Sequence, residues 1–102
     1  KKIDTEYFRA IVYVKGSSEN KIRLGYVINK KIGKSVIRNK IKRRLKEIVR
    51  NYSNNHKKDM DILIIVKKPA VYLSFEILSN VVYSSLRKAE VNFGKKNNYK
   101  NS

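Results

Sequence analysis

The chain has 102 residues, 41% of them apolar, a formal net charge of +17 at pH 7 and no cysteine. This length supports one domain with a single modest core, and the missing cysteine excludes both a disulfide framework and a thiolate metal site. So large a positive charge favours a polyanionic partner, and nucleic acid is the leading class.

Two strands and a turn are predicted in the N-terminal third. The run Tyr7–Val14 is β-branched and aromatic, and Lys15–Asn20 has the composition of a turn. Lys21–Lys30 places apolar residues at every second position from Ile22 to Ile28, which is typical of a strand packed on one face. We predict that the two strands pair antiparallel as a hairpin, and that residues 3–6 add a short edge strand.

An amphipathic helix is predicted from Ser35, as its N-cap, to Tyr52. Its apolar residues share one side at 100° per residue: Ile37, Ile41, Leu45, Ile48, Val49 and Tyr52. The segment from Lys30 to Arg50 holds 10 of the 25 basic residues and one acidic residue, Glu47. Like charges four residues apart destabilise a helix by a few tenths of a kcal/mol per pair, so we expect a polyanion to cover them. An anionic membrane is the rival partner, but the apolar side has Ile, Leu and Val of core type rather than Phe or Trp.

The C-terminal half predicts a strand and a second helix. Asp61–Lys67 is an apolar run, as expected of a central strand buried on both faces. Ser74 then caps a helix whose inner stripe consists of Phe75, Leu78, Val82, Leu86 and Ala89. We predict one domain over residues 1–91 and a disordered Asn/Lys-rich tail over 92–102. No apolar run approaches about 18 residues and no signal peptide is evident, so we expect a cytoplasmic protein without a membrane span.

Few residues could carry chemistry. His56 is predicted to be a solvated loop residue, and Asp59 with Asp61 is read as a strand-entry charge pair rather than a cation site. Gly33 precedes a helix without the frame of a phosphate-binding loop, and the serines lack a nearby base. We therefore predict no catalytic residue and no metal site in this chain.

The stretch Gly25–Arg43 closely resembles a segment of the bacterial ribonuclease P protein subunit. It contains Lys-Lys-Ile-Gly at residues 30–33, followed by Arg38-Asn39 and Lys42-Arg43 at the family's spacing, and the run Asp61–Pro69 resembles a second family segment. The resemblance covers about residues 7 to 90. It implies an α+β sandwich similar to domain 2 of ribosomal protein S5, with a four-stranded mixed sheet and a left-handed β-α-β crossover. The N-terminal helix that usually opens the family is expected to be absent, because the chain begins too late to contain it.

In the family, the protein assists a catalytic RNA that removes the 5′ leader from precursor tRNA, and the RNA holds the catalytic metal ions. The resemblance thus implies the ribonuclease P RNA subunit and precursor tRNA as partners, Mg²⁺ in the RNA–protein holoenzyme, and no cofactor held by the protein alone. No obligatory protein partner is evident. The rival functions are a stand-alone RNA-binding or ribosomal structural protein of the same fold and, less favoured, an enzyme with its own protein active site.

The resemblance also assigns site residues. The helix motif gives Arg38, Asn39, Lys40, Lys42 and Arg43 as contacts to the RNA subunit, Lys46 and Arg50 extend the band on physical grounds, and Lys30, Lys31 and Lys34 are expected to meet phosphate near the helix entrance. The resemblance implies that the leader lies in a cleft between the sheet face and a helix. Tyr13 matches a family aromatic that faces the leader, with Arg9 and Arg23 bordering the same cleft. The alternative for Tyr13 is ordinary strand packing. The third motif position is Lys40 rather than Arg, which keeps the charge but loses a planar bidentate donor.

Overall fold

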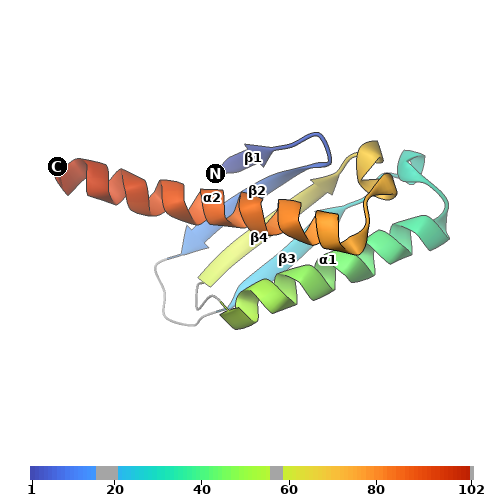
Figure 1. Cartoon of the computed structure of the whole chain (residues 1–102), viewed down its shortest axis with the longest axis horizontal. Coiled ribbons are helices and arrows are strands. Elements are labelled where there is room, and N and C mark those ends of the chain that lie inside the picture. Colours follow the sequence, from blue (N-terminus) through green and yellow to red (C-terminus); the bar gives the residue numbers. More distant parts are fainter. Residues whose placement is uncertain (16–20, 56–58, 102) are drawn as a thin grey trace.

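The computed structural model describes residues 1–15, 21–55 and 59–101. Within these ranges the chain forms (Figure 1) the elements β1 (Lys2–Asp4), β2 (Phe8–Lys15), β3 (Ile22–Val27), η1 (Lys30–Ile32), α1 (Ser35–Asn55), β4 (Asp59–Val66), η2 (Lys68–Tyr72) and α2 (Phe75–Asn101), where η marks a 3-10 helix. The expected turn lies, from Gly16 onward, outside the described residues, and so does His56. None of the described helices is long and apolar enough to span a membrane.

The four strands form one mixed sheet in the order β1-β2-β4-β3. β4 pairs antiparallel with β2 and parallel with β3, so the predicted hairpin between the second and third strands is wrong. β4 contains the continuous apolar run Ile62–Ile65. It lies between β2 and β3, so both of its edges are paired with neighbouring strands. The predicted edge strand is present as β1, at Lys2–Asp4 rather than residues 3–6, and it pairs antiparallel with β2.

The β3-α1-β4 unit has a left-handed crossover. Figure 1 views the sheet from the side that the helices cover, and when β3 and β4 are turned to point upward, β4 lies to the left of β3. Crossovers between parallel strands are nearly always right-handed, so general chain rules would have predicted the opposite hand. The hand that the family resemblance implied is the one observed.

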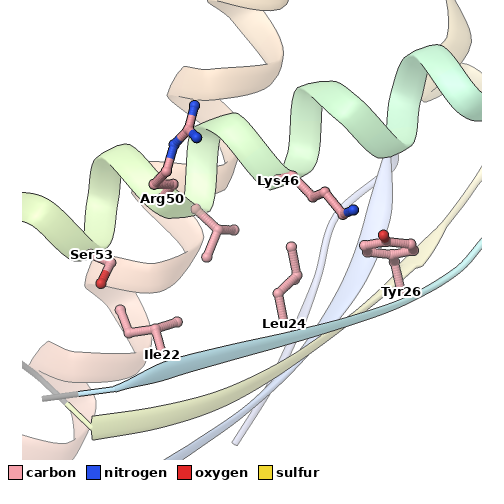
Figure 2. A pocket seen from close by; sticks show the side chains of 7 residues that line it. Ile22, Leu24, Tyr26, Lys46, Arg50 and Ser53 are labelled. Atoms are coloured by element: carbon pink, nitrogen blue, oxygen red, sulfur yellow. The ribbon is translucent and has the colours of Figure 1, made fainter.

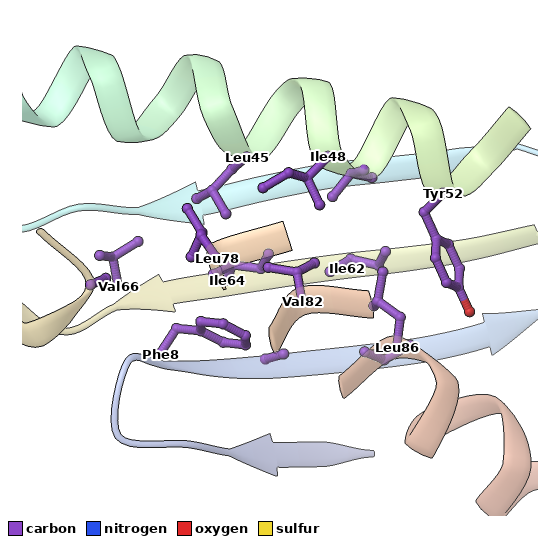
Figure 3. Packing of buried hydrophobic residues seen from close by; sticks show 14 of the residues in the cluster. Phe8, Leu45, Ile48, Tyr52, Ile62, Ile64, Val66, Leu78, Val82 and Leu86 are labelled. Atoms are coloured by element: carbon purple, nitrogen blue, oxygen red, sulfur yellow. The ribbon is translucent and has the colours of Figure 1, made fainter. Parts of the chain in front are cut away.

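Both helices pack on the same face of the sheet and close one hydrophobic core over it (Figures 1 and 3). The predicted stripe of α1 is confirmed, since five of its six residues are buried and Ile37 is half-buried. The stripe of α2 is buried as well, except for the half-buried Phe75. The sheet contributes its inward residues, namely Phe8, Ala10, Val12, Met60, Ile62, Ile64 and Val66. Tyr52 of α1 meets Tyr83 of α2 edge-on, with ring centroids 5.3 Å apart.

The helix ends differ in part from the sequence prediction. The backbone N–H of Arg38 donates to the carbonyl of Lys34 over 3.0 Å, so Lys34 rather than Ser35 occupies the N-cap position of α1. At α2 the predicted cap is confirmed, because the Ser74 hydroxyl oxygen accepts from the backbone N–H of Ile77 at 3.2 Å. α2 continues through Asn101, across the segment whose composition predicts disorder. The domain boundary after residue 91 stays a prediction.

The opposite face of the sheet is open among the described elements. Ile11 on β2 and Leu63 and Ile65 on β4 point to this face and are half-buried, whereas their inward neighbours are buried. The prediction that β4 is buried on both faces is therefore wrong in the described chain. The sheet has one face for the core and one face that remains accessible, which we call the open face.

Two polar links hold peripheral segments in place. The Lys67 ammonium donates to Asp4 Oδ1 at 2.6 Å and to the carbonyl of Thr5 at 2.7 Å, which joins the end of β1 to the end of β4. The hydrogen bond from Lys67 to Asp4, together with the positive charge and hydrogen bond of Arg9, holds the pKa of the Asp4 carboxyl below its usual value. Arg44 donates from Nη1 to the carbonyl of Leu73 at 3.1 Å, so this cation fastens α1 to the segment before α2.

Candidate nucleic-acid interface

A continuous band of cations runs along the solvent side of α1. We call it the cationic band; it consists of the five cations Arg38, Lys42, Arg43, Lys46 and Arg50 together with Asn39. Arg38 is half-buried and the other five are exposed. The apolar stripe on the opposite side of α1 is fixed in the core, so the helix cannot rotate and the band keeps a defined direction. Lys40 is also exposed, whereas Arg44 is half-buried in its link to Leu73.

No described acidic side chain forms an ion pair with the cationic band. The ion pairs found among the described residues use Asp4 and Asp61, and their cations are Lys15, Arg23, Lys67 and Arg9. The band therefore presents several positive charges within a few turns of one rigid helix, with like charges at i,i+4. An array of this kind is suited to a row of phosphates, which Arg can bind through two parallel hydrogen bonds.

The entrance to α1 adds three exposed lysines, Lys30, Lys31 and Lys34. The side chain of Asn29 accepts from the backbone N–H of Lys31 at 2.9 Å and so caps η1. Gly33 lies against Ile37, where an added Cβ would come within 3.2 Å of that side chain, so the close turn into α1 favours glycine here. The structure thus places these lysines next to the start of the cationic band.

The surface of α1 is hollowed on two sides of the band. Val36, Asn39, Lys42, Arg43 and Lys46 line an outer hollow of about 430 Å³. On the sheet side, a groove separates α1 from β3, and Figure 2 shows Lys46 extending from α1 toward the Tyr26 ring. The Lys42 ammonium lies 5.6 Å from the centroid of the same ring. The sequence did not predict a groove at Tyr26, although the alternation in β3 placed this residue on the packed face of the strand.

A second candidate surface is the open face of the sheet. Tyr13 is 65% exposed and lies opposite Asp61 of β4, and Arg23 of β3 is the other neighbour of Asp61. Asp61 holds two cations, Lys15 Nζ at 3.2 Å and Arg23 Nε at 3.8 Å. Arg9 lies on the same face, 3.4 Å from Asp4. Tyr13, Arg9 and Arg23 are thus brought to one face, and the packing alternative for Tyr13 does not hold, since its ring is mostly in solvent. No described helix covers this face, so the described residues do not form the expected cleft between sheet face and helix here.

We find no arrangement for protein-based catalysis in the described part of the chain. No group of three or more His, Cys, Asp or Glu among the described residues could hold a metal ion. Asp59 is buried and Asp61 is occupied by its ion pairs, in line with the strand-entry charge pair. What the geometry offers is two binding surfaces, one on each side of the sheet.

The fold and these surfaces define a small α+β domain that presents a cationic helix to a polyanion. The chain belongs to the ribonuclease P family, because the family model described as Ribonuclease P matches residues 1–90. The resemblance found in Gly25–Arg43 is thereby confirmed.

Individual relatives agree with this assignment. A ribonuclease P protein component from Syntrophomonas wolfei is 39% identical over 82 residues, which cover 80% of this chain and 68% of the relative. One from Dictyoglomus turgidum is 44% identical over 57 residues, which cover 56% of this chain and 47% of the relative. The matched stretches thus span about half to two thirds of the length of these relatives. A solved RNase P protein from Thermotoga maritima, in complex with 1-(4-fluorophenyl)-2-thiourea, superposes with a TM-score of 0.71 at 30% identity and covers 82% of this chain and 80% of its own.

Proposed function

We propose that this protein is the accessory subunit of ribonuclease P and assists endonucleolytic removal of the 5′ leader from precursor tRNA. The observation that carries the proposal is the cationic band, which forms no ion pair among the described residues, is held rigid by the buried stripe of α1 and lies on the segment that bears the family motif. The cationic band, Lys40 and the entrance lysines Lys30, Lys31 and Lys34 would dock the protein on the RNA subunit through phosphate contacts. Asn39 can read backbone or 2′-hydroxyl groups of the RNA.

The open face is proposed to hold the single-stranded leader. An unpaired base can stack on the exposed ring of Tyr13, and Arg9 and Arg23 lie on the same face to meet leader phosphates. Precursor and mature tRNA differ in the leader, so this surface would let the complex prefer the substrate over the product.

The chemistry is proposed to belong to the RNA subunit. Hydrolysis that leaves a 5′-phosphate on tRNA would use Mg²⁺ held by the RNA, since the described residues of the protein offer no acidic cluster for a metal ion. This role needs no cofactor on the protein. We propose that the protein acts in the cytoplasm, where the precursor tRNA is made. A stand-alone ribosomal structural role is less well supported, because the family match extends over the band and the open face together.

Tyr13→Ala tests the leader assignment. We expect the complex of this variant with the RNA subunit to bind precursor tRNA at least about fivefold more weakly, because one stacked base is lost. Its affinity for mature tRNA, which lacks the leader, should be unchanged. Equilibrium binding of both tRNAs to the reconstituted complex measures this, and Tyr72→Ala, which removes another exposed ring, from η2, is the matched control. Equal weakening for both tRNAs would remove the leader role of Tyr13.

A further inference from the structure

The groove between α1 and β3 is a feature that the phosphate-binding role of the cationic band does not use. α1 leans over β3 without covering it fully, so the inward side chains Ile22, Leu24 and Tyr26 are only half-buried. Two hollows, of about 290 and 420 Å³, both include Tyr26 in their lining, and Figure 2 shows the smaller one. Tyr26 therefore lies in the middle of a groove that runs along the helix.

The two sides of this groove differ in chemistry. Apolar and aromatic side chains of β3 form its floor, and the rim on α1 carries four cations: Arg38, Lys42, Lys46 and Arg50. None of the described residues that line the two hollows is acidic. The rim cations are spaced four residues apart, which is about 6 Å along the helix axis and similar to the distance between successive phosphates of an extended strand.

A groove with an apolar aromatic floor and a cationic rim matches unpaired nucleic acid. Single strands can turn their base faces toward an aromatic ring while the phosphates follow the charged side, whereas a duplex keeps its base faces stacked inside. An acidic peptide could form ion pairs with the rim cations but would offer no flat base to stack on the Tyr26 ring. Charge and shape together thus favour an unpaired segment of RNA.

Two details of the free protein fit an occupant of this kind. The Lys42 ammonium lies over the Tyr26 ring at 5.6 Å from its centroid, a contact that a flexible lysine can exchange for a phosphate. The Nε atom of Arg38 is buried and has no hydrogen-bond partner in the described part of the chain, and a buried unpaired donor destabilises the state that contains it. Both side chains, Lys42 and Arg38, would form a more favourable interaction with an anion bound in the groove.

We propose that the α1–β3 groove seats a short unpaired run of the RNA subunit, with one base stacked on Tyr26 and the neighbouring phosphates on Arg38, Lys42 and Lys46. This inference rests on the proposed docking to the ribonuclease P RNA subunit and adds to it a contact with single-stranded nucleotides. The site lies on the helix side of the sheet, so it is separate from Tyr13 and the leader on the open face.

The test uses the complex of the full chain with ribonuclease P RNA. Tyr26→Leu should weaken RNA binding at least about fivefold because it keeps an apolar floor but removes the ring, and Tyr26→Phe should bind within about twofold of the original protein. Tyr72→Leu makes the same change at an exposed tyrosine of η2 that belongs to neither candidate surface, and it should leave affinity for the RNA subunit unchanged. RNA containing 4-thiouridine should photo-cross-link to the unaltered protein within residues 22–28, which requires no variant to fold.

The outcomes separate the two proposals. If Tyr26→Leu binds like the original protein and no cross-link reaches residues 22–28, the groove is not occupied, although docking through the band stands. If a fully paired RNA duplex competes for the groove as well as an unpaired oligonucleotide of equal length, the occupant is not a single strand. If the unaltered protein does not bind ribonuclease P RNA at all, the proposed function fails and this inference fails with it.

Discussion

Replacing Lys42 and Arg43 together by alanine should weaken binding to ribonuclease P RNA by about 100-fold, the largest effect that we expect from any surface change. Each residue is exposed and would lose a charge-assisted contact of about 1.5 kcal/mol. The dependence of log affinity on log salt concentration should also become shallower by nearly two, because about 0.9 counterion is released per phosphate contact on duplex and somewhat less on single strands. A salt titration of binding measures both quantities.

The matched control removes the same charge from α2. Arg87 and Lys88 are exposed, and replacing both by alanine gives the same net charge as the band variant. The RNA affinity of this control should lie within about threefold of that of the original protein. Both variants should have a free energy of unfolding within about 0.5 kcal/mol of the original value, because surface substitutions rarely destabilise a protein more. If the two variants weaken binding equally, net charge rather than the position of the band determines RNA affinity.

The second large effect concerns the underside of the same helix. Leu45→Ala should lower the free energy of unfolding by about 2–5 kcal/mol, because this side chain is 1% exposed and its truncation leaves a cavity between α1 and the sheet. Such a loss is a large part of the stability of a domain of this size. Chemical denaturation followed by circular dichroism measures it.

Val36→Ala is the control within α1, since Val36 is 76% exposed in the first turn and should change stability by less than about 0.5 kcal/mol. At temperatures where Leu45→Ala is still folded, its RNA affinity should fall only in proportion to the folded fraction. A stable Leu45→Ala protein would contradict the view that the buried stripe holds the band in place.

The local elements of this fold were predictable because their signals are periodic. The 100° spacing of the apolar residues identified the buried side of α1, and Ser74 followed by an apolar stripe identified the start of α2. The alternation in β3 placed Tyr26 on the packed face of the strand, and the structure shows that this is the side of the helices. Each of these signals lies within a single element, and so it can be read without knowledge of the neighbours.

Strand order was not predictable in the same way. A strand-turn-strand pattern favours a hairpin, but β4, which comes after α1 in the chain, lies between β2 and β3. Its position depends on contacts between residues distant in sequence. The hand of the crossover came from the family resemblance and not from general rules, which give the other hand.

The candidate site was predictable as a set of charges, and less so as a shape. The motif at Arg38-Asn39 located the cationic band, and the structure places all of its members on one side of α1. The Arg44 link to Leu73 and the groove at Tyr26 depend on how α1 lies against segments far away in the sequence. These features needed the tertiary structure.

Cleavage of precursor tRNA at low Mg²⁺, by ribonuclease P RNA with and without this protein, tests the central claim most directly. We predict that the protein lowers the Mg²⁺ concentration needed for cleavage and strengthens precursor binding, and that the Lys42 and Arg43 double variant loses this benefit at equal concentration. Identical cleavage with and without the protein would contradict the claim, and so would cleavage by the protein in the absence of the RNA.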